Sequence, residues 1–454
     1  MKQTILSDRY EAFMEQSNDT IKPLINTDSE DITAVFRNYK YPISSYPVIL
    51  SKENSQKLEE VSTLIPKLLQ KIPKLYFQDD IKKIADFYFN GDEMVAQYSM
   101  MCQEREVPVS SRLDLTLTET GFKVLEINLG SSIGGIGLQN FEPSVRNTHN
   151  VLSNTTTRKQ FTFHKSQNLY IQFIVAQILA YTQTKSSKIN LFLVSDAGAG
   201  ESQNATVKDF FNELLQKELQ RIGKIGNVYM DAITSLKMQS DGLYFKENCI
   251  HSVLILDFAQ QNMSADLVRS FIMNMVYFPD HLGTTFMRDK RNLTILRKLA
   301  SEGKFEGTQN ELVLHYIPWT EVIEDIEVLY EGKTQNIIEL LKENKDKFVI
   351  KIIDGLQGKD VFIGKFTSKT DWENAIKEAL NDKKYIAQKF SDSLNLLAPN
   401  KENAWTPHKL IWGSFGFGDT YGGSWVRMSE EKTTSGVINA ATGAVEAIVY
   451  ECIS

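Results

Sequence analysis

The sequence has little cysteine and no excess of positive charge. Three cysteines, Cys102, Cys249 and Cys452, lie far apart among 454 residues, so neither a disulfide framework nor a zinc cluster is indicated. Lysine and arginine number 50 against 57 aspartates and glutamates, a formal net charge of −7. Non-specific affinity for polyanions requires a basic excess, so nucleic acid is not expected as a partner.

Long hydrophobic runs are also absent. No uninterrupted apolar stretch reaches the roughly 18 residues of a membrane span, and Met1–Tyr10 lacks the apolar segment of a secretory signal. There is no internal repeat and no low-complexity tract. We therefore expect a soluble, cytoplasmic protein that does not bind membranes.

Apolar residues make up 42% of the sequence, enough for a large buried core. The segment Leu50–Ile72 has helical spacing with Ser51 as a candidate N-cap, and a second helical stretch covers 81–97. Two alternating runs over Val107–Ser132 predict a β-hairpin that turns at Glu119–Gly121. The chain thus begins with helices followed by a hairpin.

A unit of parallel α/β structure is predicted in the middle of the chain. The buried run Ile189–Val194 precedes a glycine turn at Gly198–Gly200 and a helix over 204–222, and Val253–Phe258 supplies another buried strand. Strand, turn and helix in this order are typical of a parallel sheet. We expect a Rossmann-like subdomain over roughly 150–290.

The last third alternates strands with helices and ends in glycine-rich β-structure. The predicted elements are a helix over 289–300, strands over 348–353 and 361–366, a helix over 371–380, a strand over 385–390 and β-structure over 412–450. Within the last of these, Gly413–Gly423 mixes aromatic residues with glycines. It is either a mobile lid or a loose surface hairpin.

The segment Phe348–Gly364 could bind phosphate. A strand ends near Lys351, a loop with Gly355 and Gly358 follows, and a second strand returns. Backbone N–H groups and a compact ammonium group can face an anion in such a hairpin. The alternative is an ordinary hairpin with a solvated lysine.

Two later stretches could complete a nucleotide site. Tyr385–Phe390 is a buried strand with polar Gln388, and adenine requires amide or backbone hydrogen bonds in an apolar slot. A hairpin predicted over Trp425–Gly443 could present Arg427 to a phosphoryl oxygen. A plain strand and an exposed structural arginine are the alternatives.

Glu126 and Asn128 predict a metal site. On a strand their side chains share one face and Ile127 takes the other. Oxygen donors at this spacing suit magnesium, which usually takes one or two carboxylates together with substrate phosphates. A solvated strand face would show the same pattern.

These motifs together resemble a known family. They are Arg112-Leu-Asp114, Glu126-Ile-Asn128 with its Gly/Ser loop, Val349-Ile-Lys351 with its glycine loop, Tyr385-Ile-Ala-Gln388 and Val426-Arg427. In combination they resemble the circularly permuted ATP-grasp ligases, specifically the branch of eukaryotic-type glutathione synthetase and glutathionylspermidine synthetase. Their order carries the resemblance, because the acid-Asn metal motif precedes the phosphate lysine, whereas it comes last in the usual ATP-grasp order.

The resemblance implies an α/β fold of circularly permuted ATP-grasp type with an inserted Rossmann-like parallel-sheet subdomain. Its parts would be a helical segment with the metal- and substrate-binding hairpin over 1–149, the Rossmann-like subdomain over 150–288, and the nucleotide-binding and lid region over 289–454. It implies a ligase that uses ATP and Mg²⁺ to convert a carboxylate to an acylphosphate and to join the acyl group to an amine, releasing ADP and phosphate. Amino acids, small peptides, amines or a ribosomal peptide would be substrates, and a homodimer is compatible.

The resemblance also assigns roles to single residues. Magnesium ligands would be Glu126, Asn128 and Asp354. Nucleotide contacts would come from Lys290, Lys351, Gly355, Gly358, Gln388, Lys389, Phe390 and Asn439. The catalytic residues would be Arg427, Arg112 and Lys351, and the substrate contacts Arg112, Ser131 and Ser132. The lid departs from the family, since Gln357 and Asp360 replace glycines and Asp354 replaces a glutamate.

Two other functions are considered. Gly198–Gly200 could begin the dinucleotide site of an oxidoreductase, but Gln203 stands where that fingerprint has its third glycine. A catalytically silent nucleotide-binding or interaction module with the same fold is the other, because fold alone does not determine function. The joint presence of metal, phosphate and arginine motifs argues against it.

Overall fold

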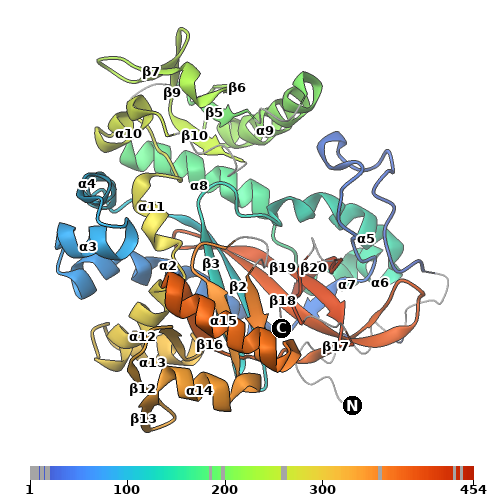
Figure 1. Cartoon of the computed structure of the whole chain (residues 1–454). Helices are drawn as coiled ribbons and strands as arrows, with labels where there is room; N and C mark the ends of the chain where they lie inside the picture. Colours follow the sequence, from blue (N-terminus) through green and yellow to red (C-terminus); the bar gives the residue numbers. More distant parts are fainter. Residues whose placement is uncertain are drawn as a thin grey trace.

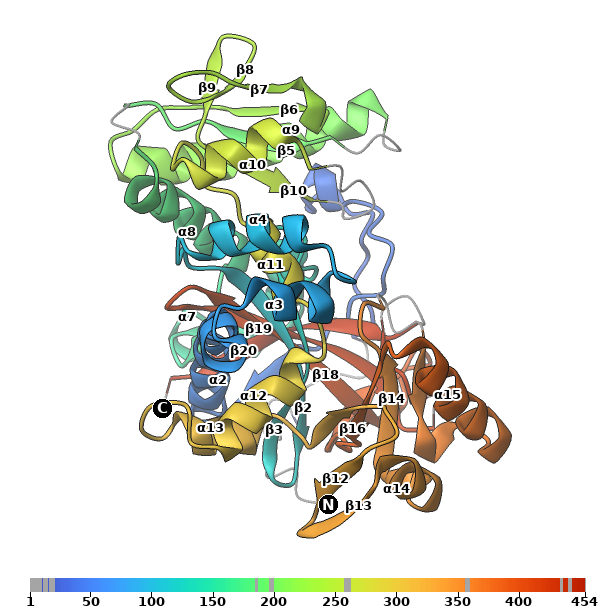
Figure 2. The same ribbon diagram turned by 60° about the vertical axis from the view of Figure 1, so that its left-hand side comes forward.

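The protein has a mixed α/β fold in which several sheets are surrounded by helices (Figure 1). The computed structural model describes Tyr10, Glu15 and residues 21–183, 187–195, 200–256, 263–355, 360–432, 436–439 and 443–453. A parallel sheet and a four-stranded antiparallel sheet lie at opposite ends of the molecule, with the largest sheet between them (Figure 2). No helix in these described ranges is long and apolar enough to cross a membrane.

The largest sheet combines strands from the first and last parts of the described chain. Its order is β1-β20-β19-β18-β2-β3, with β17 beside β18 and β4 beside β20. Only the β1–β20 pair is parallel. The bounds are β1 (Val48–Leu50), β2 (Ser110–Thr118), β3 (Gly121–Leu129), β4 (Phe161–Thr162), β17 (Asn395–Pro399), β18 (Trp405–Phe417), β19 (Thr420–Glu430) and β20 (Val445–Cys452).

Helix α2 (Lys52–Gln70) covers one face of this sheet and confirms the first predicted helix. Ser51 is its N-cap and accepts a hydrogen bond from the Asn54 amide. At the contact, Ser62 Oγ lies 2.6 Å from Ser414 Oγ of β18. Helix α2 does not cover the opposite face of the sheet.

The second predicted helix is two helices, α3 (Ile81–Tyr88) and α4 (Glu93–Gln103). Between them Asn90 and Gly91 take positive φ angles of 52° and 85°, which ends α3. Asp92 then caps α4 by accepting from the Met94 and Val95 amides. The apolar residues keep their helical spacing across Asn90 and Gly91, so the sequence pattern alone does not show the break.

The middle of the chain forms the predicted parallel unit. The strand order is β10 (Ser252–Ile255), β5 (Leu191–Val194) and β6 (Val228–Asp231), all parallel. Its helices are α8 (Ser166–Tyr181), α9 (Glu201–Arg221) and α10 (Ala265–Ile272). Strand β6 was not predicted, because it is too short and too mixed in polarity to stand out.

A four-stranded antiparallel sheet follows in the last third. Its order is β11 (Thr320–Val322), β16 (Tyr385–Lys389), β14 (Phe348–Ile352) and β15 (Val361–Ile363), which confirms three predicted strands. Helices α14 (Ile337–Glu343) and α15 (Lys369–Asp382) pack with it around Trp372 in a core of its own.

The remaining elements are helices and the strands of two small antiparallel sheets, one of three strands and one of two. They are α5 (Glu142–Thr148), α6 (Asn150–Ser153), α7 (Thr155–Arg158), β7 (Leu236–Met238), β8 (Leu243–Phe245), β9 (Asn248–Ile250), α11 (Leu282–Met287), α12 (Asn292–Ser301), α13 (Gln309–Tyr316), β12 (Glu327–Tyr330) and β13 (Lys333–Asn336).

Two expectations about the glycine-rich end are wrong. Gly413–Gly423 is not a lid, and it is not loose: it forms the turn end of the β18–β19 hairpin, with Phe417 in register with Thr420 and with Phe415 and Phe417 buried. The second strand of the Arg427 hairpin is β20, and residues 436–439 lie outside any strand. The three-part domain division stays a prediction, although β17–β20 share a sheet with β1–β3.

Candidate functional site

Polar side chains line one face of the β2–β3 hairpin. Arg112 is paired in register with Asn128, and Asp114 with Glu126. Paired residues on neighbouring strands point to the same side of a sheet, while Ile127 is buried on the other. The predicted metal residues and the predicted substrate arginine therefore share one surface.

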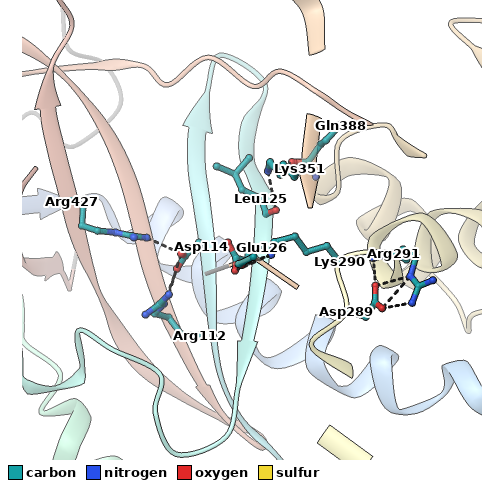
Figure 3. A network of polar contacts seen from close by, with 11 residues as sticks. Arg112, Asp114, Leu125, Glu126, Asp289, Lys290, Arg291, Lys351, Gln388 and Arg427 are labelled. Carbon is teal, nitrogen blue, oxygen red and sulfur yellow. Dashed lines mark hydrogen bonds and ion pairs between the residues drawn. The ribbon is translucent and has the colours of Figure 1, made fainter. Parts of the chain in front are cut away.

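Asp114 joins two arginines from distant parts of the chain (Figure 3). Arg112 donates to its two carboxylate oxygens from Nε and Nη2, over 2.7 and 3.1 Å, and Arg427 donates from Nη2 over 2.8 Å. Burial alone would raise the pKa of Asp114, but the charges of the two arginines hold that pKa below its usual value. In this cluster two guanidinium groups donate hydrogen bonds to one ionised carboxylate.

Gly413 of β18 makes room for the Trp425 indole from β19. It is paired in register with Asp114 on one side and with Trp425 on the other. A Cβ at Gly413 would lie 2.3 Å from Trp425 Nε1, so the indole lies over this glycine. The Arg427 guanidinium carbon lies 5.2 Å from the Trp425 ring centroid, and Arg427 reaches past β18 to β2.

A second carboxylate, Glu446 of β20, stands in register with Arg427. Glu446 is buried, and burial raises its pKa to about 7 despite opposing hydrogen-bond and charge interactions with Tyr39 and Arg427. Among the residues that the structure describes, its Oε2 has no hydrogen-bond partner, nor do Arg427 Nε and Trp425 Nε1. At pH 7 Glu446 is therefore about half protonated, and the cluster carries less negative charge than two fully ionised carboxylates would give it.

Lys290 approaches the same face from the segment before α12. Its Nζ donates to the Gly355 carbonyl over 2.8 Å and lies 3.7 Å from Glu126 Oε1 (Figure 3). The lysine side chain is 7% exposed, and the glutamate side chain is 32% exposed. Lys290 thus joins the hairpin to the start of the predicted phosphate loop.

Lys351 of β14 reaches the hairpin from the four-stranded sheet. Its Nζ donates to Gln388 Oε1 over 2.7 Å and to the Leu125 carbonyl over 3.3 Å. Burial lowers the pKa of Lys351 to about 8, with Glu126 opposing and Lys290 adding to the change. A lysine so placed holds its proton less firmly than an exposed one.

The predicted substrate loop is fixed by a residue that the sequence did not indicate. Asp280 accepts from Ser131 N over 3.0 Å and from Ser131 Oγ over 2.5 Å, and from Arg288 Nη2 over 2.8 Å. Gly130 has a φ of +100°, and a Cβ there would lie 2.0 Å from Asp280 Oδ1. Ser132 is half-buried in the same loop.

The oxygen donors fit a metal that protein and substrate hold together. Glu126 and Asn128 share the face, and each offers a side-chain oxygen there, while Asn128 Nδ2, a donor and not a metal ligand, is buried without a partner among the described residues. Asp354 is exposed, and the described residues contain no group of three or more His, Cys, Asp or Glu side chains that could hold a metal. Two protein donors together with substrate phosphates are a set that magnesium accepts.

The remaining predicted nucleotide residues are not all gathered at this face. Gln388 is 1% exposed, and its amide is shared between Lys351 and Thr320. Lys389 is exposed and pairs with Glu331 over 2.8 Å.

Phe390 and Asn439 are half-buried. The ring of Phe390 lies 6.4 Å from that of Phe366, and the Asn439 carbonyl accepts from the Ala444 amide. Gly358 lies outside the described residues, as does Gly198 of the oxidoreductase alternative.

Sequence reasoning missed Glu446, Asp280 and Trp425. Glu446 and Asp280 stand among apolar or mixed neighbours with no motif around them, and Trp425 adjoins the Val426-Arg427 motif, in which the arginine is the residue that suggests chemistry. Of the three, Glu446 carries a signal, since an acidic residue next to the apolar run Ala447–Tyr450 of β20 requires a polar partner when it is buried. Tyr39 forms a hydrogen bond with Glu446, and the neighbouring charge of Arg427 is visible only once β19 and β20 are paired.

Comparison with known proteins adds little. No protein-family model and no curated protein matches the chain. Among solved structures, D-alanyl-alanine synthetase A from Vibrio cholerae O1 biovar eltor aligns with a TM-score of 0.24 and 12% identity, over 50% of this chain and 68% of that chain. A likeness at this level carries no argument, so function is inferred from the site itself.

Proposed function

We propose that this protein is an ATP-dependent carboxylate-amine ligase that forms an amide bond through an acylphosphate and releases ADP and phosphate. One observation carries the proposal. Lys290 and Lys351, from separate elements, reach the strand that bears Glu126 and Asn128. Two ammonium groups beside oxygen donors can bind a metal-bound polyphosphate, the ammonium groups at its phosphates and the oxygen donors at its metal.

The arginine cluster supplies the second requirement of this chemistry. Phosphoryl transfer depends chiefly on positioning and on neutralising negative charge. Arg112 and Arg427 are already oriented by Asp114, so they would meet an incoming carboxylate or phosphoryl group with little reorganisation. Magnesium, held by Glu126, Asn128 and the phosphates, would supply further charge neutralisation.

Within this class, the order of the motifs supports the circularly permuted branch that includes glutathione synthetase and glutathionylspermidine synthetase. The carboxylate substrate would then be an amino acid, a small peptide or a peptide side chain, and the acceptor an amine. Asp280 and Gly130 hold Ser131 where a substrate contact is proposed.

A substrate screen tests the proposal directly. Purified protein is incubated with ATP, Mg²⁺ and pairwise combinations of amino acids or dipeptides with amines. We expect ADP and phosphate together with a product whose mass equals both substrates minus water. AMP and pyrophosphate, or undiminished turnover by Glu126→Ala, would contradict the mechanism. Nucleotide binding with no turnover for any pair would favour the silent module.

A further inference from the structure

Glu126 is already paired with a cation of the protein itself. Lys290 Nζ lies 3.7 Å from Glu126 Oε1 and donates to the Gly355 carbonyl. In the described ranges Lys290 is the single ion-pair partner of Glu126. The ammonium is largely buried, so it depends on these two partners for the stabilisation that water would otherwise provide.

This pairing conflicts with metal binding when no anion is present. A divalent cation on Glu126 would place like charges close together in a partly dehydrated site. If Lys290 withdrew instead, its ammonium would lose the carboxylate and gain nothing. A polyphosphate removes the conflict, because its oxygens attract both the ammonium and the metal.

We propose that Lys290 is an exchangeable counter-ion of Glu126, which makes metal and nucleotide binding mutually dependent. Without ligands Lys290 neutralises Glu126. With both ligands the metal takes its place at the carboxylate and Lys290 turns to the phosphates. The proposal rests on the proposed function for the identity of the anion.

The other lysine at the site is arranged differently. Lys351 donates to the neutral oxygens of Gln388 and Leu125, and within the described part of the chain it forms no ion pair. Its loss would weaken nucleotide binding but would release no carboxylate. Lys290 is therefore the residue whose substitution should move the two affinities in opposite directions.

The test uses Mn²⁺ as the metal probe, measured by electron paramagnetic resonance of the free ion, and a non-hydrolysable ATP analogue as the anion probe. Wild type is compared with Lys290→Gln and with Lys290→Met, which keeps the aliphatic volume if the glutamine variant folds poorly. For Mn²⁺ alone, both variants should bind tighter by on the order of tenfold, because a repulsive charge beside the site is gone. Both should bind the analogue more weakly.

Lys298→Gln is the matched control, since it removes one exposed lysine of α12 and changes the net charge equally. It should alter neither affinity. Lys290→Arg keeps the charge and should bind Mn²⁺ alone as weakly as wild type does.

Two failures are distinguishable. If the analogue does not bind to wild type, or if Glu126→Gln leaves Mn²⁺ binding unchanged, the proposed nucleotide and metal site is wrong. If wild type binds the analogue and Glu126→Gln abolishes Mn²⁺ binding, but the Lys290 variants bind Mn²⁺ no tighter than wild type, the counter-ion exchange is wrong and the proposed function stands.

Discussion

Arg427 Nη2 donates a hydrogen bond to Asp114 Oδ2 over 2.8 Å, which links residues 313 positions apart in the chain. Strand β18 lies between the two residues, with Gly413 in register with Asp114 and Ile411 in register with Arg427. One contact thereby ties the last hairpin of the sheet to the first and fixes the arginine that we assign to phosphoryl transfer.

Asp114→Asn should destabilise the fold as well as the site. The substitution keeps the shape but leaves two buried guanidinium groups without a carboxylate, and breaking a buried ion pair typically costs about 3–5 kcal/mol. Urea denaturation should show this loss in the free energy of unfolding. Glu331→Gln is the control, because it breaks the exposed pair with Lys389 and should change stability by less than about 1 kcal/mol. Equal effects would show that the arginine cluster adds no stability.

Gly130→Ala should lower the stability of the fold markedly more than Gly443→Ala does. Both glycines have similar positive φ angles, +100° and +96°, so the backbone strain of alanine is matched. At Gly130 the new Cβ would collide with Asp280, whereas at Gly443 no atom of the described residues lies within 4 Å. We expect an additional loss of roughly 1–3 kcal/mol at Gly130, typical of overpacking. Thermal melts of the two variants provide the comparison, and similar melting temperatures would argue against a fixed Ser131 loop.

Glu446 should make stability depend on pH. Its pKa rises from 4.5 to about 7 on folding, so the folded protein holds the proton more firmly than the unfolded chain. The stabilisation from this proton is full below pH 4.5 and is lost as the pH rises through 7. The free energy of unfolding of Glu446→Gln, taken relative to that of wild type, should rise by on the order of 3 kcal/mol between pH 5 and pH 8. Parallel stability curves for the two proteins would contradict this.

Lys351 should make nucleotide binding depend on pH. Its pKa of about 8 without ligand means that the ammonium is lost as the pH rises above 8, and the affinity for the ATP analogue should fall over that range. Lys351→Met should bind more weakly by about 1.5–3 kcal/mol, the value of a hydrogen bond to a charged group, and should lose the pH dependence. Lys342→Met, an exposed change on α14, should keep the wild-type profile. Calorimetry at several pH values measures both the affinity for the ATP analogue and its pH dependence.

The local elements were predictable because their signals are local. Ser51 caps α2, and the alternation around Ile127 placed Glu126 and Asn128 on one face. Strand partners were not predictable in this way. Gly413–Gly423 has the composition of a loose loop, yet it lies inside the largest sheet because its glycines accommodate Trp425 and neighbouring backbone.

The site was predictable as a set of motifs but not as an arrangement. The motifs named Lys290, Lys351 and Arg427, and the structure brings them to the β2–β3 hairpin. The arrangement depends on pairs that no spacing reveals, such as Asp280 with Ser131 and Glu446 with Arg427. Buried charges are matched across the fold and not along the chain.

The pairing of β2 with β18 also sets a condition on synthesis. Between Thr118 and Trp405 the ribosome must add nearly 300 residues, which takes roughly 15–60 s at 5–20 residues per second. Until then β2 has no neighbour on that side, and its unpaired backbone can bind other extended chains. A nascent chain arrested before β18 should therefore be more prone to aggregation or chaperone capture than one that already carries it.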